Sequence, residues 1–348
     1  MKLLIFNAIT ILYFLITTLL FIYGLHAYTL IILYQKNKSK TPQRPRQLGS
    51  FPFVTVQLPI YNEYYVVERL LNSATDLDYP KERLEIQILD DSTDSTKELC
   101  KQLAGVFKEK GFDVDYCHRS DRVGFKAGAL REGLKRAKGD FIAIFDADFV
   151  PKKDFLLKTL PYFEDPGVGL VQARWGHINR EYSYLTNIQA MMLDNHFAIE
   201  QVARNTSGCF INFNGTAGIF RKQCIIDAGN WQDDTLSEDI DISYRAQLKK
   251  WKFVFLKDVV CPAELPVQIN AFKNQQFRWA SGTFQCAFKL LPKIINSNLP
   301  LITKFQSIMH LTNYLVYPLV LLWGILSAPI ILINKSYHPF ILLSHFTG

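Results

Sequence analysis

The chain has 348 residues, 49% of them hydrophobic, and a formal net charge of +7 at pH 7. No basic run is interleaved with aromatic residues, so the composition argues against a nucleic-acid-binding protein. The six cysteines are scattered, with no Cys-x-x-Cys pattern and no paired histidine, which favours reduced cytosolic thiols over zinc sites or disulfides.

The N-terminal segment is predicted to be a membrane helix. No Lys, Arg, Asp or Glu occurs from Leu3 to Gln35, and this run exceeds both the roughly 20 apolar residues that span a bilayer and the core of about 7–15 residues in a cleavable signal peptide. We therefore expect a transmembrane helix over residues 1–35. The basic linker that follows, residues 36–51, marks the cytoplasmic side, which places the N-terminus outside the cell.

The central part of the chain is predicted to form an α/β domain over residues 52–284. Runs typical of strands alternate with helical patterns, which favours a mostly parallel sheet with helices on both faces. Ligands bind beyond the carboxyl ends of such strands. The expected strands are 53–60, 84–90, 112–118, 140–146 and 168–174, and the expected helices are 64–75, 95–110, 126–138 and 152–164.

Acidic residues follow the first two strands. Glu63 comes shortly after the strand at 53–60, and Asp90 and Asp91 close the strand at 84–90. Helix capping accounts for a Ser or Asp just beyond this point, but it does not account for two consecutive acids at the tip of a strand. We expect Asp90 or Asp91 to bind a ligand.

Asp146 and Asp148 end the strand at 140–146. Alternate residues of a strand point to the same side, so both carboxylates can face one point. Hard oxygen ligands suit Mg²⁺ or Mn²⁺, with phosphate and water completing the shell. The alternative is an ordinary surface turn, in which such triplets are frequent.

Lys126 lies between two glycines near the start of the helix at 126–138. Phosphate groups bind at helix N-termini where glycines let the backbone approach, so Lys126 is a candidate to neutralise a diphosphate. The alternative is a lysine on the solvent face of an amphipathic helix. Residues 213–221, rich in small side chains, are predicted to form a tight turn beside the cleft.

Two further motifs lie downstream. Glu238 and Asp239 begin a helix after Ser237. Acids at this position stabilise a helix through its dipole, and one of them could also act as a general base. In the segment 274–282, Gln275, Arg278 and Trp279 form either an interfacial anchor with a snorkelling arginine or a sugar site.

The C-terminal part is again apolar. We expect an interfacial amphipathic segment at 285–304, a transmembrane segment at 305–334 and the start of a further membrane segment at 335–348. The last segment ends so early that the sequence is interpreted as a fragment of a longer protein.

In this order the motifs resemble those of the membrane-embedded family 2 glycosyltransferases of the processive type, such as cellulose and mannan synthases. The family pattern D, DxD, (T/E)ED, QxxRW matches Asp90–Asp91, Asp146–Ala147–Asp148, Ser237–Glu238–Asp239 and Gln275–Gln276–Phe277–Arg278–Trp279. The stretches around these motifs most resemble plant-type glucomannan synthases. The resemblance implies a nucleotide-sugar-binding domain of the GT-A type flanked by transmembrane helices.

The resemblance also implies roles for these residues. Asp90 or Asp91 contacts the nucleotide base, and Glu63 and Asp146 belong to the donor site. Lys126 lies near the diphosphate, and Asp146 with Asp148 holds Mg²⁺ or Mn²⁺. Asp239, beside Glu238, is the base that deprotonates the acceptor, while Gln275, Arg278 and Trp279 form the acceptor and pyrophosphate end.

The implied reaction is an inverting transfer of a hexose from UDP-glucose or GDP-mannose to a growing β-linked polysaccharide. It would take place at the cytoplasmic face of the cell (inner) membrane, in a multi-pass protein. The expected partners are the nucleotide sugar, a polysaccharide or glycolipid acceptor, the lipid bilayer and accessory or export subunits, with no nucleic acid.

Three alternatives stay open at this point. The first is single addition to a lipid, as in ceramide glucosyltransferases, which only the size of the product separates from polymerisation. A nucleotidyltransferase would carry a glycine-rich loop after the strand at 53–60, which is absent. A non-catalytic scaffold has no need of acids at three cleft positions. The sequence does not distinguish the donor sugar, the linkage or the oligomeric state.

Overall fold

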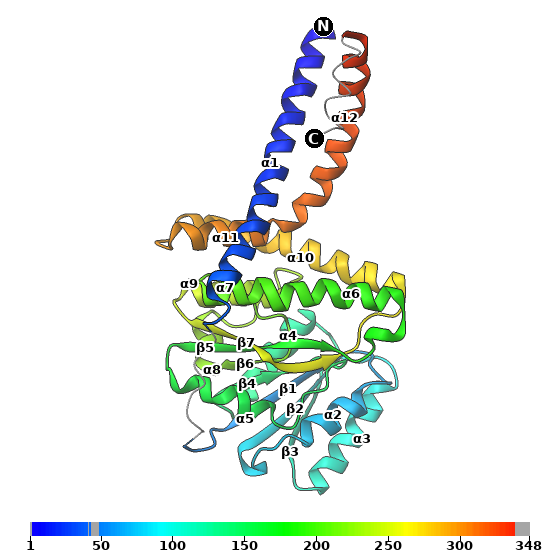
Figure 1. Cartoon of the computed structure of the whole chain (residues 1–348). Coiled ribbons are helices and arrows are strands. Elements are labelled where there is room, and N and C mark those ends of the chain that lie inside the picture. Colours follow the sequence, from blue (N-terminus) through cyan, green and yellow to red (C-terminus); the bar gives the residue numbers. More distant parts are fainter. Residues whose placement is uncertain (1, 41, 43–48, 338–348) are drawn as a thin grey trace.

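The structure, a computed structural model, describes residues 2–40, 42 and 49–337. In Figure 1 a pair of long helices, α1 (Lys2–Asn37) and α12 (Val316–Tyr337), rises from one side of an α/β domain. The domain therefore presents one side to the helix pair and the opposite side, with α2 (Val67–Thr75) and α3 (Thr96–Glu109), away from it.

A seven-stranded sheet forms the centre of the domain within the described residues, in the order β3-β2-β1-β4-β6-β5-β7. Only β6 is antiparallel to its neighbours, which confirms the expected mostly parallel sheet. The strands are β1 (Val54–Ile60), β2 (Leu84–Asp90), β3 (Asp113–His118), β4 (Phe141–Ile144), β5 (Val168–His177), β6 (Gly218–Arg221) and β7 (Lys252–Ala263).

Helices cover both faces of the sheet. One core lies under α2 (Val67–Thr75), α3 (Thr96–Glu109) and α5 (Phe155–Thr159) with the 3₁₀ turn Leu160–Glu164. The other lies under α4 (Phe125–Arg136), α8 (Lys222–Asp227) and α9 (Glu238–Leu248). The central strands β1 and β2 are buried along nearly their whole length, as expected for parallel strands covered on both faces.

A further layer separates the second core from the helix pair (Figure 1). It contains α6 (Tyr184–Asn195), the π-helical segment His196–Gln201, α7 (Val202–Thr206), α10 (Ile269–Ile295) and α11 (Leu301–Leu311). A third, smaller core between α9, α10 and α11 joins this layer to the domain. The single helix α10 runs through position 284/285, where the sequence suggested a boundary between domain and interfacial segment.

By length and composition, the helices at Phe6–Asn37 and Asn313–Ile331 could each cross a membrane. Far from the domain the two contact each other: the rings of Tyr13 and Trp323 stack at 5.9 Å, and Trp323 Nε1 donates to Thr17 Oγ1 at 3.1 Å. The segment expected at 335–348 falls mainly outside the described residues, as do positions 41 and 43–48 of the linker.

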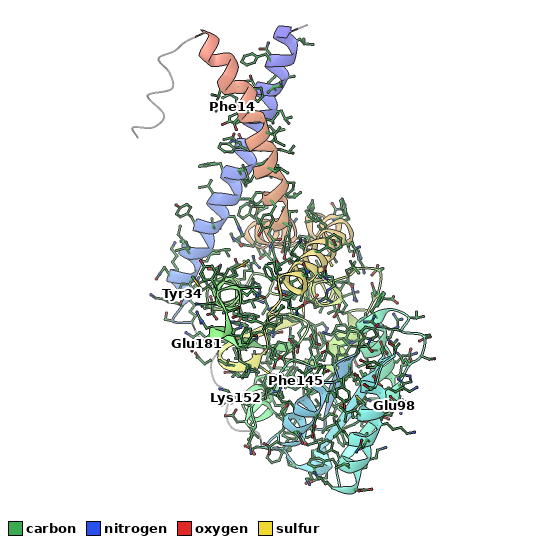
Figure 2. The ribbon with its side chains drawn as sticks, turned by 90° about the vertical axis from the view of Figure 1, so that its right-hand side faces the viewer. Phe14, Tyr34, Glu98, Phe145, Lys152 and Glu181 are labelled. Atoms are coloured by element: carbon green, nitrogen blue, oxygen red, sulfur yellow. The ribbon has the colours of Figure 1, made fainter. Side chains whose placement is uncertain are left out.

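The second half of α1 lies on the domain. Figure 2 shows Phe14 high on the helix and Tyr34 near its foot, against the domain. His26 Nε2 hydrogen-bonds to Gln306 Oε1 of α11 at 2.8 Å, and Asn37 Nδ2 donates to Ser207 Oγ at 3.2 Å. The helix is therefore anchored to the domain as well as to α12.

Candidate active site

Lys126 lies at the centre of the candidate site. Its Nζ is 2.5 Å from Asp146 Oδ1, donates to the Gly215 carbonyl at 2.9 Å and lies 3.8 Å from Glu238 Oε1. Burial opposes the positive charge, yet Asp146 and Glu238 outweigh it and raise the pKa of Lys126. One ammonium group thus joins α4, the turn after β4, the turn before β6 and the start of α9.

The start of α4 requires a glycine. Gly124 has φ +72°, and a Cβ at this position would lie 2.3 Å from Asp233 Oδ2. Glycine enters this left-handed region at least cost, and a Cβ here would also have to displace the Asp233 side chain. Lys126 is consequently presented in the first turn of α4, where the sequence predicted it.

The loop before α4 is tied to the end of β2 by Arg119. Its guanidinium donates to both carboxylate oxygens of Asp91, at 2.8 and 2.5 Å, and to the carbonyls of Val123 and Phe125, both at 2.9 Å. Such a bidentate pair is strong and geometrically specific. Asp91 therefore fixes the loop that leads into α4 and Lys126.

Asp90 is held entirely inside the protein. Its carboxylate accepts hydrogen bonds from Ser92 N at 2.9 Å and Tyr116 Oη at 2.8 Å, and contacts His118 Nδ1 at 3.2 Å, with no exposed surface. The expected contact of Asp90 or Asp91 with a nucleotide base stays a prediction.

Asp146 and Asp148 do not lie on a strand. β4 ends at Ile144, because Ile144 makes the last pairing with β6 at Gly218 and the chain then turns. The Asp146 amide donates to Thr216 Oγ1 at 2.9 Å, and the Asp148 carbonyl accepts from the Glu264 amide at 3.2 Å. The predicted strand end at 146 was wrong. The turn after β4, and not the alternation of side chains along a strand, determines the positions of the two carboxylates.

The electrostatics of this turn favour a cation. Burial, and then the Asp146 carboxylate, raises the pKa of Asp148 to about 7. Burial and Asp146 likewise raise the pKa of Glu63. Like charges close together resist ionisation, so a divalent ion shared by Asp146 and Asp148 would relieve their repulsion.

Protein side chains alone do not complete a metal site in the part of the chain that the structure describes. No group of three or more His, Cys, Asp or Glu side chains there is arranged to hold an ion. Mg²⁺ and similar hard cations are commonly bound by one or two carboxylates together with substrate phosphates and water. Asp146 and Asp148 fit that kind of shared site.

The first turn of α9 supplies the candidate base. Burial, and then Glu238, raises the pKa of Asp239 to about 7, and Asp239 Oδ1 accepts from the Ile240 amide at 2.8 Å. A general base is most effective with a pKa near the working pH. Asp241, the third acid of this turn, is instead structural: it is fully buried and pairs with Arg245 at 2.7 Å and Lys289 at 2.8 Å.

The helix α10 packs against the start of α9 through a glycine. A Cβ on Gly282 would lie 2.1 Å from Ser237 Oγ. Gln285 Oε1 accepts from the Leu236 amide at 2.7 Å, and Lys289 Nζ is 2.6 Å from Asp234 Oδ1. These contacts fix the two helices against each other.

The QxxRW motif lies in the N-terminal half of α10. Arg278 is exposed, while Gln275 and Trp279 are half-buried. Burial raises the pKa of Glu238, while the positive charges of Lys126 and Arg278 both lower it. The arginine is therefore electrostatically linked to the acidic turn of α9.

We expect Gly282→Ala to destabilise the protein by about 1–3 kcal/mol, the usual cost of overpacking. The added methyl group must push α10 away from Ser237, so transfer activity should fall with stability. Gly105→Ala in α3, where a Cβ meets nothing within 4 Å, is the matched control and should be neutral or stabilising. Equal melting temperatures for Gly282→Ala and Gly105→Ala would contradict this packing of α10 against Ser237.

Residues 52–282 match the profile of "Glycosyltransferase like family 2". The chain belongs to this glycosyltransferase family.

Its similarity to named relatives is high: it is 40% identical over 301 residues to "Probable glucomannan 4-beta-mannosyltransferase 7" of Oryza sativa subsp. japonica, covering 84% of this chain and 52% of that protein. It is 43% identical over 258 residues to "Glucomannan 4-beta-mannosyltransferase 2" of Arabidopsis thaliana, covering 72% and 48%. The chain thus spans about half the length of these curated relatives.

Two solved structures of other proteins share the fold. The "Mannosyltransferase PcManGT from Pyrobaculum calidifontis in complex with GDP-Man and Mn2+" superposes with a TM-score of 0.70 at 21% identity, over 97% of this chain and 94% of that one. "S. aureus TarS 1-349 in complex with UDP-GlcNAc" gives a TM-score of 0.55 at 18% identity, over 75% and 72%. These likenesses confirm the GT-A type fold.

Some contacts that shape the site of this family member were not predicted, including the carbonyl partner of the predicted Lys126. Arg119 donates to the Asp91 carboxylate, 28 positions away. Lys126 donates to the Gly215 carbonyl, 89 positions away, and Gln285 accepts from an amide 49 positions away. Such distant pairs leave no local pattern. Gly282 does lie in a segment that the sequence analysis singled out, because it is the last residue of 274–282.

Proposed function

We propose that the protein is an inverting glycosyltransferase that transfers mannose from GDP-mannose to a growing β-linked polysaccharide. The donor and acceptor class come from the relatives, whose names specify glucomannan 4-β-mannosyl transfer, and from the GDP-mannose complex of PcManGT. The observation that carries the proposal is the position of Lys126, which lies 2.5 Å from Asp146 and also beside Glu238.

In the proposed reaction the acceptor hydroxyl attacks the anomeric carbon of the donor. A bond forms between the acceptor oxygen and this carbon, while the bond from the carbon to the phosphate oxygen breaks. Asp239 takes the proton from the hydroxyl, and the nucleotide diphosphate leaves with the electron pair. Attack from the side opposite the leaving group inverts the carbon, so an α-linked donor gives a β-glycoside.

Lys126 stabilises the negative charge that develops on the leaving diphosphate. Fixed charges in a partly desolvated site contribute more than the same charges in water. Asp146 and Asp148 would hold Mg²⁺ or Mn²⁺, which supplies Lewis-acid stabilisation of the same oxygens. Glu63, Asp90 and Asp91 complete the proposed donor site, the last through its ion pair with Arg119.

The acceptor is proposed to approach along α10. Trp279 offers an aromatic face, and Gln275 and Arg278 offer donors, on the helix that packs beside Glu238 and Asp239. Since α10 and α11 lie between the domain and the helix pair (Figure 1), we propose that the acceptor side of the site faces the membrane. We place α1 and α12 in the cell membrane of a multi-pass protein, the domain in the cytoplasm, and accessory or export subunits among the partners.

Chelation tests the donor site directly. In membranes containing the protein, EDTA should abolish transfer from GDP-mannose and Mn²⁺ or Mg²⁺ should restore it, because the ion that Asp146 and Asp148 would hold stabilises the leaving diphosphate. Binding of GDP-mannose should weaken in parallel. Transfer that continues unchanged in EDTA would contradict the assignment of these two carboxylates.

A further inference from the structure

The turn that contacts Lys126 belongs to a buried segment without regular secondary structure. Residues 211–217 are all buried yet form neither helix nor strand. Buried backbone groups need hydrogen-bond partners, and here side chains supply many of them. The Ile211, Phe213 and Asn214 amides donate to Gln247 Oε1, Ser243 Oγ and Gln172 Oε1, at 3.1, 2.8 and 3.2 Å respectively.

Gln201 holds this segment from the side of the membrane-proximal layer. It has no exposed surface, and its Nε2 donates to Asn214 Oδ1 at 2.9 Å and to the Asn212 carbonyl at 3.1 Å. Asn212 Nδ2 donates to the same Asn214 Oδ1 at 2.8 Å. The Asn214 side chain is therefore fixed by two amide donors.

The position of Gln201 depends on an irregularity in its helix. Residues His196–Gln201 are π-helical between α6 and α7, and such short π segments are frequent at functional sites. His196 and Gln201 both reach Asn214 from this segment, His196 Nε2 contacting Asn214 Nδ2 at 3.3 Å. The helix α1 packs against the same segment and against α7.

Asn214 is followed directly by the residue that orients Lys126. Gly215, at φ +82°, offers its carbonyl to Lys126 Nζ, and a Cβ there would lie 3.4 Å from Asp239 Oδ2 and 3.5 Å from Lys126 Nζ. A shift of Asn214 would therefore move the neutral partner of Lys126 within a site of carboxylates.

We propose that Gln201 is a positioning residue, which fixes the Gly215 carbonyl through Asn214 and so directs Lys126 toward the donor diphosphate. This inference rests on the proposed function, because it assigns Lys126 to donor binding. It predicts that Gln201→Met, which keeps the side-chain length but removes the amide, weakens donor binding only while Lys126 is present.

A double-mutant cycle on the full chain in detergent or membranes tests the proposal. In the presence of Mn²⁺, Gln201→Met should raise the Kd for GDP-mannose about threefold to tenfold, the loss expected for one hydrogen bond. In the Lys126→Met background the same substitution should change the Kd by less than about twofold, because residues acting through one another are not additive. Equal effects in both backgrounds would overturn the proposal.

The matched control is Gln189→Met. Gln189 is buried on α6 and donates to the carbonyls of Leu185 and Pro266, so its loss carries a similar stability cost without touching Asn214. It should leave the Kd for GDP-mannose unchanged, and an effect equal to that of Gln201→Met would count against the proposal.

A second measurement needs no donor and separates this inference from the proposed function. Amide hydrogen exchange in residues 211–217 should rise in Gln201→Met and not in Gln189→Met, because local opening is set by local hydrogen bonding. Unchanged exchange in Gln201→Met would overturn the proposal that Gln201 holds this segment through Asn214. If exchange rises in Gln201→Met but the wild-type protein binds neither GDP-mannose nor UDP-glucose, the role of Gln201 in holding Asn214 stands and the proposed function is refuted.

Discussion

Replacing Asp239 with Asn is expected to reduce transfer by about a hundredfold to ten-thousandfold, the usual contribution of a general base. The amide cannot accept the proton of the acceptor hydroxyl. Its Oδ1 can still accept from the Ile240 amide, as Asp239 does at 2.8 Å, so the start of α9 should stay folded. Donor binding should be largely retained, and labelled-sugar transfer and isothermal titration would measure the two effects separately.

The pH dependence of transfer provides a second view of Asp239. Burial, and then Glu238, raises the pKa of this carboxyl to about 7, and only its deprotonated form is a base. The value of kcat/KM should therefore fall as the pH drops below about 7. Asp258→Asn, an exposed position, is the control and should behave as wild type. Loss of donor binding in Asp239→Asn would refute the assignment of the base.

Lys126→Met is expected to weaken donor binding by about 1.5–3 kcal/mol, the range for hydrogen bonds to charged groups. The lysine is the cation that touches Asp146 and Glu238, at 2.5 and 3.8 Å. Its loss removes a charge that lowers the pKa of Asp239. The acid limb of the pH profile should therefore shift to higher pH in this variant.

The matched control for this prediction is Lys135→Met. Lys135 lies on the same helix, α4, but it is exposed and pairs with Glu132 three positions away. Exposed pairs of this kind contribute little, so donor affinity and the pH profile should not change. A Lys126→Met protein with wild-type affinity for GDP-mannose would contradict the central place given to this lysine.

Much of the fold could be predicted because the first five strands are short runs typical of β-structure that alternate with helical patterns. The strand β6 was missed because it has four residues and follows a stretch of small side chains that indicates a turn. The strand β7 was missed for another reason. Its pairing with β5 shifts between Ala173, opposite Leu256, and Arg174, opposite Val260, and this bulge breaks the alternation that marks a strand.

The candidate site was predictable as a set of residue types, but not as a set of contacts. The sequence indicates acids at strand ends and at the start of α9, yet it does not show that Asp90 is enclosed by Tyr116 and His118, or that Asp241 is structural. Both outcomes depend on residues that the fold brings close: Lys289 reaches Asp241 from α10. A dense row of acids can thus contain a candidate base and, two residues further along, a buried ion pair.

The most direct test of the proposed function is the product made by the full-length protein in membranes, with Asp239→Asn as the inactive control. Radiolabelled GDP-mannose, UDP-glucose and UDP-N-acetylglucosamine would be supplied separately, and the product sized and digested. We expect a long, β-mannanase-sensitive polymer from GDP-mannose and none from Asp239→Asn. A single sugar on a chloroform-soluble lipid, or a polymer made equally well by Asp239→Asn, would contradict the proposal.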